Sequence, residues 1–190
     1  MVRPPQTGHA MPADEERQLI SRARTGSHGA FRILVERHMK HAYDVAFSFV
    51  GNHDDASDVT QEAFLRAYGA LSSFREEAGF GTWLHRIVMN LAMNRAKKNR
   101  TRLAREVDAA EAPAAAGEPE GEDLRGHIER ALHELPTLQR AVVILRTMDG
   151  LSTKQVSNIL RCSEGTVKTH LFRGLRKMKA KLEFLQEDAR

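Results

Sequence analysis

The sequence predicts an all-α protein built from two small helical domains. Three observations support this fold class: apolar residues recur at helical spacing in both halves of the chain, strand signals are sparse, and a stretch rich in Ala, Pro, Gly and Glu separates the halves. The expected organisation is a disordered tail at 1–13, a larger domain at 14–102, a connector at 103–123 and a smaller domain at 124–186.

The larger domain contains three segments with helical periodicity, and their apolar residues repeat every three or four positions, as in helices with one buried face. These residues are Phe31, Leu34, Val35, Val45, Ala46 and Phe49, then Val59, Ala63, Phe64, Ala67 and Leu71, then Trp83, Leu84, Ile87, Val88 and Leu91. The third helix, which we expect to begin near Thr82, also carries a polar stripe on another side. The stripe consists of Arg86, Asn90, Asn94 and Lys97.

The connector differs in composition from both domains. Between 106 and 123, Ala, Pro and Gly alternate with acidic residues, and no large apolar side chain follows Val107. Such a segment cannot bury enough apolar surface to offset the entropy lost on ordering. We therefore expect a flexible acidic linker here.

The smaller domain has the pattern of a helix-turn-helix. Ser152 and Gln155 form a capping box in front of a short helix, a tight turn follows at Arg161 and Cys162, and Ser163 can cap a longer helix. The exposed side of the longer helix is expected to carry Lys168, Thr169, Phe172, Arg173 and Arg176. A basic helix end alone would be ordinary, but on the second helix of a capped helix-turn-helix it indicates DNA recognition.

Composition excludes several classes of protein. The 190 residues are 41% hydrophobic and 28% charged, with a formal net charge of +4. No apolar run approaches the roughly 20 residues of a membrane span, so we expect no membrane insertion. The start of the chain lacks the apolar core of a secretory signal and Cys162 is the single cysteine, so a cytoplasmic location is expected. We interpret Cys162 as a packing residue in the turn, not a redox centre.

Three motifs follow one another along the chain. They are Asp55-Ala-Ser-Asp58-Val-Thr-Gln61-Glu62-Ala-Phe64-Leu-Arg66-Ala, then Phe80-Gly-Thr-Trp83-Leu-His-Arg86-Ile, then Leu135-Pro136 followed by Glu164-Gly165-Thr166-Val167-Lys168-Thr169. Together they resemble the extracytoplasmic-function (ECF) sigma factors, minimal bacterial sigma subunits that keep only regions 2 and 4. The resemblance implies an alternative RNA polymerase sigma factor that binds core polymerase, directs it to promoters and helps melt the minus-ten element. It implies no enzymatic activity and no cofactor.

The resemblance also implies roles for individual residues. The melted minus-ten strand would meet aromatic, amide and basic side chains, which can stack on bases, pair with base edges and hold phosphates. These are Phe80, Trp83, Arg86, Asn90, Asn94, Lys97 and Lys98. The duplex minus-thirty-five element would meet the recognition-helix residues Lys168, Thr169, Phe172, Arg173 and Arg176. One departure is His170, where many relatives carry Arg.

Protein partners follow from the same resemblance. The family's equivalent of the 55–66 helix docks on the polymerase clamp helices, which implies docking residues Asp55, Asp58, Gln61, Glu62 and Arg66. Segment 135–148 is the implied contact with the polymerase flap, and an anti-sigma factor is a further implied partner.

Three other interpretations compete with this one. A one-component helix-turn-helix regulator would bind duplex DNA without polymerase, but would leave the Asn90 and Asn94 stripe without a role. Residues 54–58 match the Asp-Asp-x-x-Asp magnesium motif of helical prenyl-diphosphate enzymes, yet no second aspartate cluster accompanies them. His38 and His41, with Asp44 one turn further, have helical spacing suited to a metal. Surface histidines at such spacing are more common than metal sites, so we expect neither a catalytic residue nor a metal.

Overall fold

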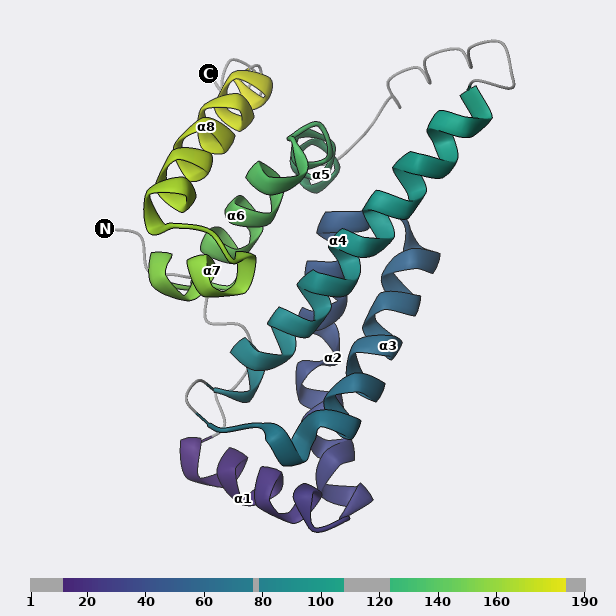
Figure 1. Ribbon diagram of the computed structural model, residues 1–190, viewed down its shortest axis with the longest axis vertical. Coiled ribbons are helices and arrows are strands. Elements are labelled where there is room, and N and C mark those ends of the chain that lie inside the picture. Colours follow the sequence, from purple (N-terminus) through teal and green to yellow (C-terminus); the bar gives the residue numbers. More distant parts are fainter. Residues whose placement is uncertain (1–11, 77–78, 108–123, 184–190) are drawn as a thin grey trace.

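The structure is a computed structural model that describes residues 12–76, 79–107 and 124–183. These residues form eight α-helices and one short 3-10 helix, arranged in two groups that lie side by side (Figure 1). Helices α1 to α4 make up the first group and α5 to α8 the second. The predicted all-α fold with two helical domains is therefore confirmed. Within the described segments, no helix has both the length and the apolar character needed to cross a membrane.

The N-terminal domain is a bundle of three long helices, with a shorter helix across one end (Figure 1). Its elements are α1 at Ala13–Arg24, α2 at His28–Val50, α3 at His53–Ala70, the 3-10 helix η1 at Leu71–Ser73 and α4 at Phe80–Val107. The side chains of Leu34, Val45, Phe49, Leu84 and Val88 are completely buried between α2, α3 and α4. These residues belong to the periodic apolar sets found in the sequence, so the periodicity correctly predicts which side of each helix is buried.

Helix α4 is longer than the sequence analysis expects. It begins at Phe80, two residues before Thr82, and it continues through Val107, past the expected domain boundary at 102. Residues 103–106 are Leu, Ala, Arg and Glu, which all have high helix propensity, so nothing local stops the helix there. The rest of the predicted linker, 108–123, and residues 1–11 of the predicted tail lie outside the described residues.

Polar caps set the helix boundaries in the N-terminal domain. The Ser27 side chain accepts a hydrogen bond from the backbone N–H of Ala30, and Asn52 accepts one from Asp55 at 2.8 Å. Gly51 ends α2 in the left-handed conformation, with φ of +82°. A Cβ atom at this glycine would lie 2.5 Å from the imidazole of His133 in the other domain, so Gly51 also permits a close approach between the domains.

The C-terminal domain contains the predicted helix-turn-helix. Its elements are α5 at Leu124–His133, α6 at Thr137–Thr147, α7 at Thr153–Leu160 and α8 at Glu164–Leu182. The capping box is present: Ser152 Oγ accepts from the Gln155 N–H at 3.2 Å, and Gln155 Oε1 accepts from the Ser152 N–H at 2.8 Å. Ser163 caps α8 by accepting from the Thr166 N–H at 3.0 Å. These local bonds fix the angle at which α8 leaves the turn.

Helix α8 packs on α6 through a glycine. Gly174 is buried, and a Cβ atom there would lie 2.7 Å from Val143 Cγ2. We expect Gly174→Ala to destabilise the protein, because overpacking costs about 1 to 3 kcal/mol while the better helix propensity of Ala returns at most about 1 kcal/mol. The matched control is Gly69→Ala in α3, where nothing lies within 4 Å of the added carbon. Thermal unfolding should show a lower midpoint for the first variant and not for the second; equal midpoints would contradict the packing argument.

One arginine connects the two domains. Arg140 of α6 is 9% exposed, and its Nη1 donates to the carbonyl oxygen of Phe49 in α2 at 2.7 Å. Its Nε donates to the carbonyl of Leu132 at 2.9 Å, and the guanidinium lies over the Phe49 ring at 5.5 Å. The guanidinium thus donates hydrogen bonds to carbonyl groups at the C-terminal ends of one helix from each domain, where the helix dipoles favour positive charge.

Candidate nucleic-acid interface

The polar stripe of α4 is continuous and exposed. Arg86, Asn90, Asn94 and Lys97 all lie on the solvent side of the helix, as does Lys98. Their positions follow the helical repeat, so one side of α4 offers two amides between cationic groups. None of these side chains makes a hydrogen bond or ion pair with another described residue, and all are therefore available to a ligand.

The aromatic residues before the stripe are arranged differently from the expectation. Phe80 is completely buried, and its ring packs near His38 at a centroid distance of 5.2 Å and near Trp83 at 5.7 Å. Phe74 is also buried, whereas Trp83 is half-buried. Phe80 therefore supports the site from the core and does not present its ring to a base. The sequence alone does not show which of Phe80 and Trp83 is buried, because both are large aromatic residues close to the start of the same helix.

The recognition helix presents the predicted residues to solvent. Lys168, Thr169, Arg173 and Arg176 are exposed, and Phe172 is 66% exposed although it is large and apolar. The Arg176 guanidinium lies 5.9 Å from the centre of the Phe172 ring. Val167 is the buried anchor on the opposite side of α8. An exposed aromatic ring among cations is suited to contact with thymine methyl groups and phosphates.

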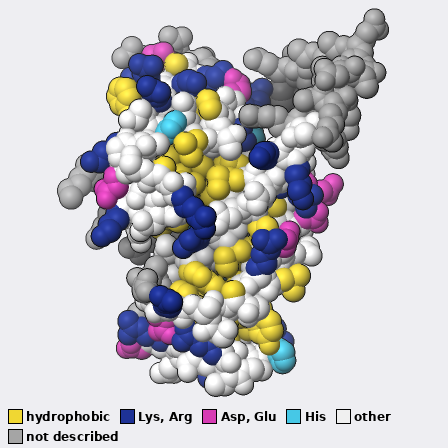
Figure 2. Space-filling view, in the orientation of Figure 1, with side chains coloured by type: hydrophobic (Ala, Val, Ile, Leu, Met, Phe, Trp, Pro, Cys, Tyr) yellow, Lys and Arg dark blue, Asp and Glu magenta, His cyan; other side chains and the backbone are white. Residues whose placement is uncertain are grey.

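Positive charge is not gathered into a single patch. Figure 2 shows Lys and Arg side chains scattered over the whole visible face, with apolar side chains exposed among them. A cavity of about 370 Å³ lies where the domains meet, and it is lined by Trp83 and Arg86 of α4 and by Gln155, Asn158 and Ile159 of α7. The first helix of the helix-turn-helix thus lies beside the start of the α4 stripe.

Helix α3 carries a polar face, but its members are not equally available. The side chains of Asp58 and Glu62 are 61% and 46% exposed, and they pair with Arg95 at 3.0 Å and Arg66 at 2.6 Å. Gln61 is exposed. Asp55 departs from the expectation, because its side chain is only 16% exposed. It accepts a hydrogen bond from Asn99 of α4 at 2.6 Å and therefore holds the two helices together.

The sequence analysis missed an apolar residue on the same helix. Leu65 is 74% exposed, the most exposed of the large hydrophobic residues described. It lies four residues after Gln61 and three after Glu62, so it belongs to their face. The signal was present, since Leu65 is out of phase with the buried set Val59, Ala63 and Ala67. A single exposed Leu is ordinary on a protein surface, so Leu65 adds an apolar group to this face without by itself indicating a partner.

The segment expected to contact the polymerase flap is mostly core. All five residues of 141–145 are buried, whereas Thr147 and Met148 are exposed at the end of α6. Only the ends of segment 135–148 can therefore contact a partner in this arrangement.

His38 and His41, which the sequence suggests as a metal-binding pair, contact different residues. His38 Nε2 donates to Glu16 Oε1 at 3.1 Å, and this hydrogen bond lowers the pKa of the Glu16 carboxyl. Asp44 pairs instead with Lys40 at 2.7 Å. His41 turns to the other domain, where its Nε2 donates to Asp149 Oδ1 at 2.8 Å. The combination of His38, His41 and Asp44 is therefore not formed.

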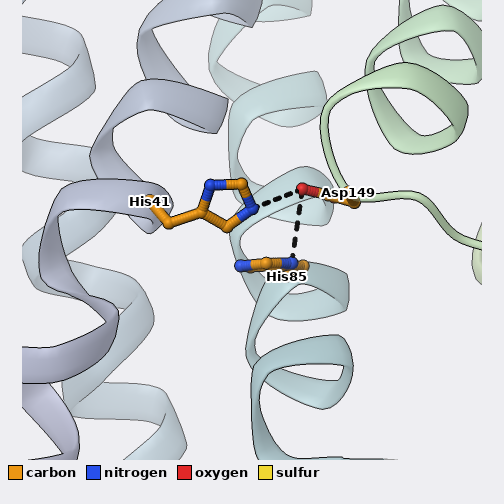
Figure 3. Close-up of side chains that lie close together, drawn as sticks. All are labelled: His41, His85 and Asp149. Carbon is orange, nitrogen blue, oxygen red and sulfur yellow. Dashed lines mark hydrogen bonds and ion pairs between the residues drawn. The ribbon is translucent and has the colours of Figure 1, made fainter. Parts of the chain in front are cut away.

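A different cluster forms where the domains meet. His41 of α2, His85 of α4 and Asp149, which follows α6, converge on one point (Figure 3). His85 Nδ1 lies 3.4 Å from Asp149 Oδ1. Burial lowers the pKa of His85 to about 4, against an opposing effect of the Asp149 charge, so this imidazole is neutral at pH 7. No local sequence pattern links residues 41, 85 and 149, and the cluster was not predicted.

Two family models match the chain. Sigma-70 region 2 matches residues 34–102 and Sigma-70, region 4 matches residues 125–178. The first match contains most of α2, α3 and the α4 stripe, and the second contains the helix-turn-helix. The two exposed surfaces described above therefore lie one in each region.

Relatives match over nearly the whole length. The chain is 36% identical to the ECF RNA polymerase sigma-E factor of Escherichia coli strain K12, over 82% of this chain and 87% of that one. It is 32% identical to the RNA polymerase sigma-H factor of Pseudomonas aeruginosa, over 93% of this chain and 98% of that one. Among solved structures, CnrH in complex with the cytosolic domain of CnrY aligns with a TM-score of 0.66 and 28% identity, over 90% of this chain and 98% of that chain. With both sigma regions matched and homologues of this kind, the chain belongs to the ECF sigma factors and is an alternative RNA polymerase sigma factor with regions 2 and 4.

Proposed function

We propose that this sigma factor recognises its promoters through two separate surfaces, the α4 stripe for opened minus-ten DNA and the exposed face of α8 for duplex minus-thirty-five DNA. The observation that carries the proposal is the uninterrupted, exposed α4 stripe, Arg86 to Lys97. A one-component regulator has no need of a second DNA surface outside its helix-turn-helix.

The α4 stripe has the chemistry for a single strand. The twelve residues from Arg86 to Lys97 span roughly 16 Å of α-helix, which is enough for a few unstacked nucleotides. Asn90 and Asn94 in the middle can pair with base edges, while the cations at the ends hold phosphates. The half-buried Trp83 lines a cavity next to Arg86, where it can contact the first base.

The α8 face has the chemistry for a duplex. The capped turn and the packing of Gly174 on α6 hold α8 rigidly, so its exposed side can enter a major groove. Arg173 and Arg176 can bind guanine edges and phosphates, and Phe172 can contact a thymine methyl group. Lys168 and Thr169 lie near the N-terminal end of the helix, where close approach to the backbone is favourable.

Docking on core polymerase is assigned to α3. Asp58, Glu62, Gln61 and Arg66 surround the exposed Leu65, which gives the face an apolar centre with a charged rim. Protein interfaces commonly have this organisation. The exposed end of α6 at Thr147 and Met148 is the second docking point, on the flap.

We also propose an anti-sigma partner and a cytoplasmic location. CnrH, one solved relative, is in complex with the cytosolic domain of CnrY, and a partner of that kind would cover the same functional faces here. Core polymerase and promoter DNA are in the cytoplasm, so the chain has to be there when it acts.

Reconstituted transcription tests the function. The purified chain is combined with core polymerase and genomic fragments, and the 5′ ends of the transcripts are sequenced. We expect start sites that lie downstream of one shared pair of promoter elements, and only when the chain is added. Fragments bound equally well by the chain without polymerase, with no promoter-dependent transcripts, would instead identify a one-component regulator.

A further inference from the structure

We propose that His41, His85 and Asp149 bind one divalent transition-metal ion, and that this ion holds the two domains of the sigma factor together in the arrangement seen here. The site combines one residue from each of α2 and α4 with a third from the turn after α6 (Figure 3). It is separate from the α4 stripe, the α8 face and the α3 face, and it goes beyond promoter recognition.

The ligand atoms are already close together. One nitrogen from each histidine and one Asp149 oxygen all lie within 4.8 Å of one another. Zn²⁺ binds nitrogen and oxygen ligands at about 2.0 to 2.2 Å in a tetrahedron, so two ligand atoms of a filled site are separated by roughly 3.3 Å. The measured distances of 2.8 Å from His41 and 3.4 Å from His85 to Asp149 Oδ1 bracket this value. Side-chain rotation alone can therefore make room for the ion.

The burial of the carboxylate is the second observation. The Asp149 side chain is 0% exposed, and its Oδ2 atom has no hydrogen-bond partner among the described residues. An ionised carboxylate withdrawn from water is costly unless a positive charge compensates it. The Nε2 atom of His85 is also buried without a hydrogen-bond partner among the described residues. A divalent cation held by Asp149 and the two imidazoles would compensate the buried carboxylate.

The donor set selects the class of ion. Two imidazole nitrogens and one carboxylate oxygen are ligands for Zn²⁺ and neighbouring transition metals, whereas Mg²⁺ prefers oxygen ligands and retains its water. Three protein ligands leave the fourth position of a tetrahedron to a water molecule. His41 is half-buried, so the ion can enter from the solvent side between the domains.

Bound metal would connect the domains. His41 and His85 belong to region 2, and Asp149 belongs to region 4, so the ion bridges the two regions. In the joined arrangement α7 lies beside Trp83 and Arg86, at the start of the α4 stripe. Metal binding would therefore favour the form in which α7 lies beside the half-buried Trp83, while Arg86 and the rest of the stripe stay exposed.

The test begins with metal binding by the full-length chain. Protein freed of metal with a chelator is titrated with Zn²⁺ by calorimetry, with Mg²⁺ as a parallel arm. We expect saturation at one Zn²⁺ per chain and none with Mg²⁺. His41→Gln and Asp149→Asn should each bind Zn²⁺ at least about 100-fold more weakly, because each removes a ligand. The matched control is His38→Gln, which changes a histidine of the same helix that contacts Glu16 and not Asp149.

Domain closure is measured on the same samples. Trp83 is the single tryptophan and lines the cavity between the domains, so its quenching by acrylamide reports closure. Zn²⁺ should reduce this quenching and the radius of gyration in the wild type and in His38→Gln, but not in Asp149→Asn. No stoichiometric binding, or wild-type affinity in folded Asp149→Asn, would overturn the metal site. Unchanged quenching and radius in a chain that binds Zn²⁺ at these residues would overturn the bridging role.

Discussion

Asp58→Arg combined with Glu62→Arg is expected to weaken binding to core polymerase at least about 100-fold, because placing like charges across an interface costs several kcal/mol. Both side chains are exposed on α3, on either side of Gln61 and next to Leu65. The expected loss is large because the change reverses two charges on the α3 face that we propose for docking.

The fold should survive this double substitution. The ion pairs that are lost, Asp58 with Arg95 and Glu62 with Arg66, lie at the surface, where such pairs contribute about 0 to 1 kcal/mol. Helix content by circular dichroism should therefore be unchanged. The measurement is affinity for core polymerase by fluorescence anisotropy of labelled protein.

A matched control distinguishes an effect of the α3 position from an effect of the protein's net charge. Asp14→Arg combined with Glu36→Arg changes the charge equally, at exposed positions on α1 and α2. It should leave affinity within a few-fold of the wild type. If both double variants lost affinity to the same extent, the effect would come from overall charge, and α3 would not be the docking face.

The second large effect separates the two DNA surfaces. Arg173→Ala should cost about 1 to 3 kcal/mol in holoenzyme binding to duplex promoter and should relax selection in the upstream element, since a bidentate arginine contact carries this amount of discrimination. Asn90→Ala should affect a later step of initiation, the opening of the DNA strands. Its closed complex should form normally, while strand opening falls, because the lost amide contact no longer helps offset an unstacking cost of a few kcal/mol per base.

Pre-melted promoters distinguish the two defects. Filter binding measures complex formation, and permanganate reactivity of thymines measures opening, on matched duplex and pre-melted templates. Pre-melting the downstream element should partly rescue Asn90→Ala and do little for Arg173→Ala. Loss of closed-complex binding by Asn90→Ala, with normal opening of the complexes that remain, would remove the α4 stripe from single-strand capture.

Features specified locally could be predicted from the sequence. The caps at Ser152 and Ser163 depend on residues three positions apart, and both are present in the structure. The exposed stripe of α4 follows from helical periodicity alone, and Asn90 and Asn94 lie where it places them. Helix ends were less certain, as the extension of α4 to Val107 shows, because a run of good helix formers carries no stop signal.

Features that depend on distant contacts could not be predicted. Asp55 lies three residues before Asp58 on the same helix, but Asn99 of another helix binds it and removes it from the exposed face. Phe80 and Trp83 differ in exposure because of how α4 meets the rest of the bundle. The cluster of His41 and Asp149 joins residues 108 positions apart, which no spacing rule anticipates.

Helix α7 lies across a cavity from Trp83, which is half-buried, whereas Arg86 and the rest of the α4 stripe stay exposed. If the opened strand binds α4 as proposed, a first base that needs the side of Trp83 facing α7 would bind only to molecules in which the domains have separated. The measured affinity therefore equals the intrinsic affinity multiplied by the fraction of open molecules. Each increment of about 1.4 kcal/mol that favours the joined form weakens apparent binding tenfold, although no DNA contact has changed. A partner that keeps the domains apart would raise promoter affinity without touching the DNA.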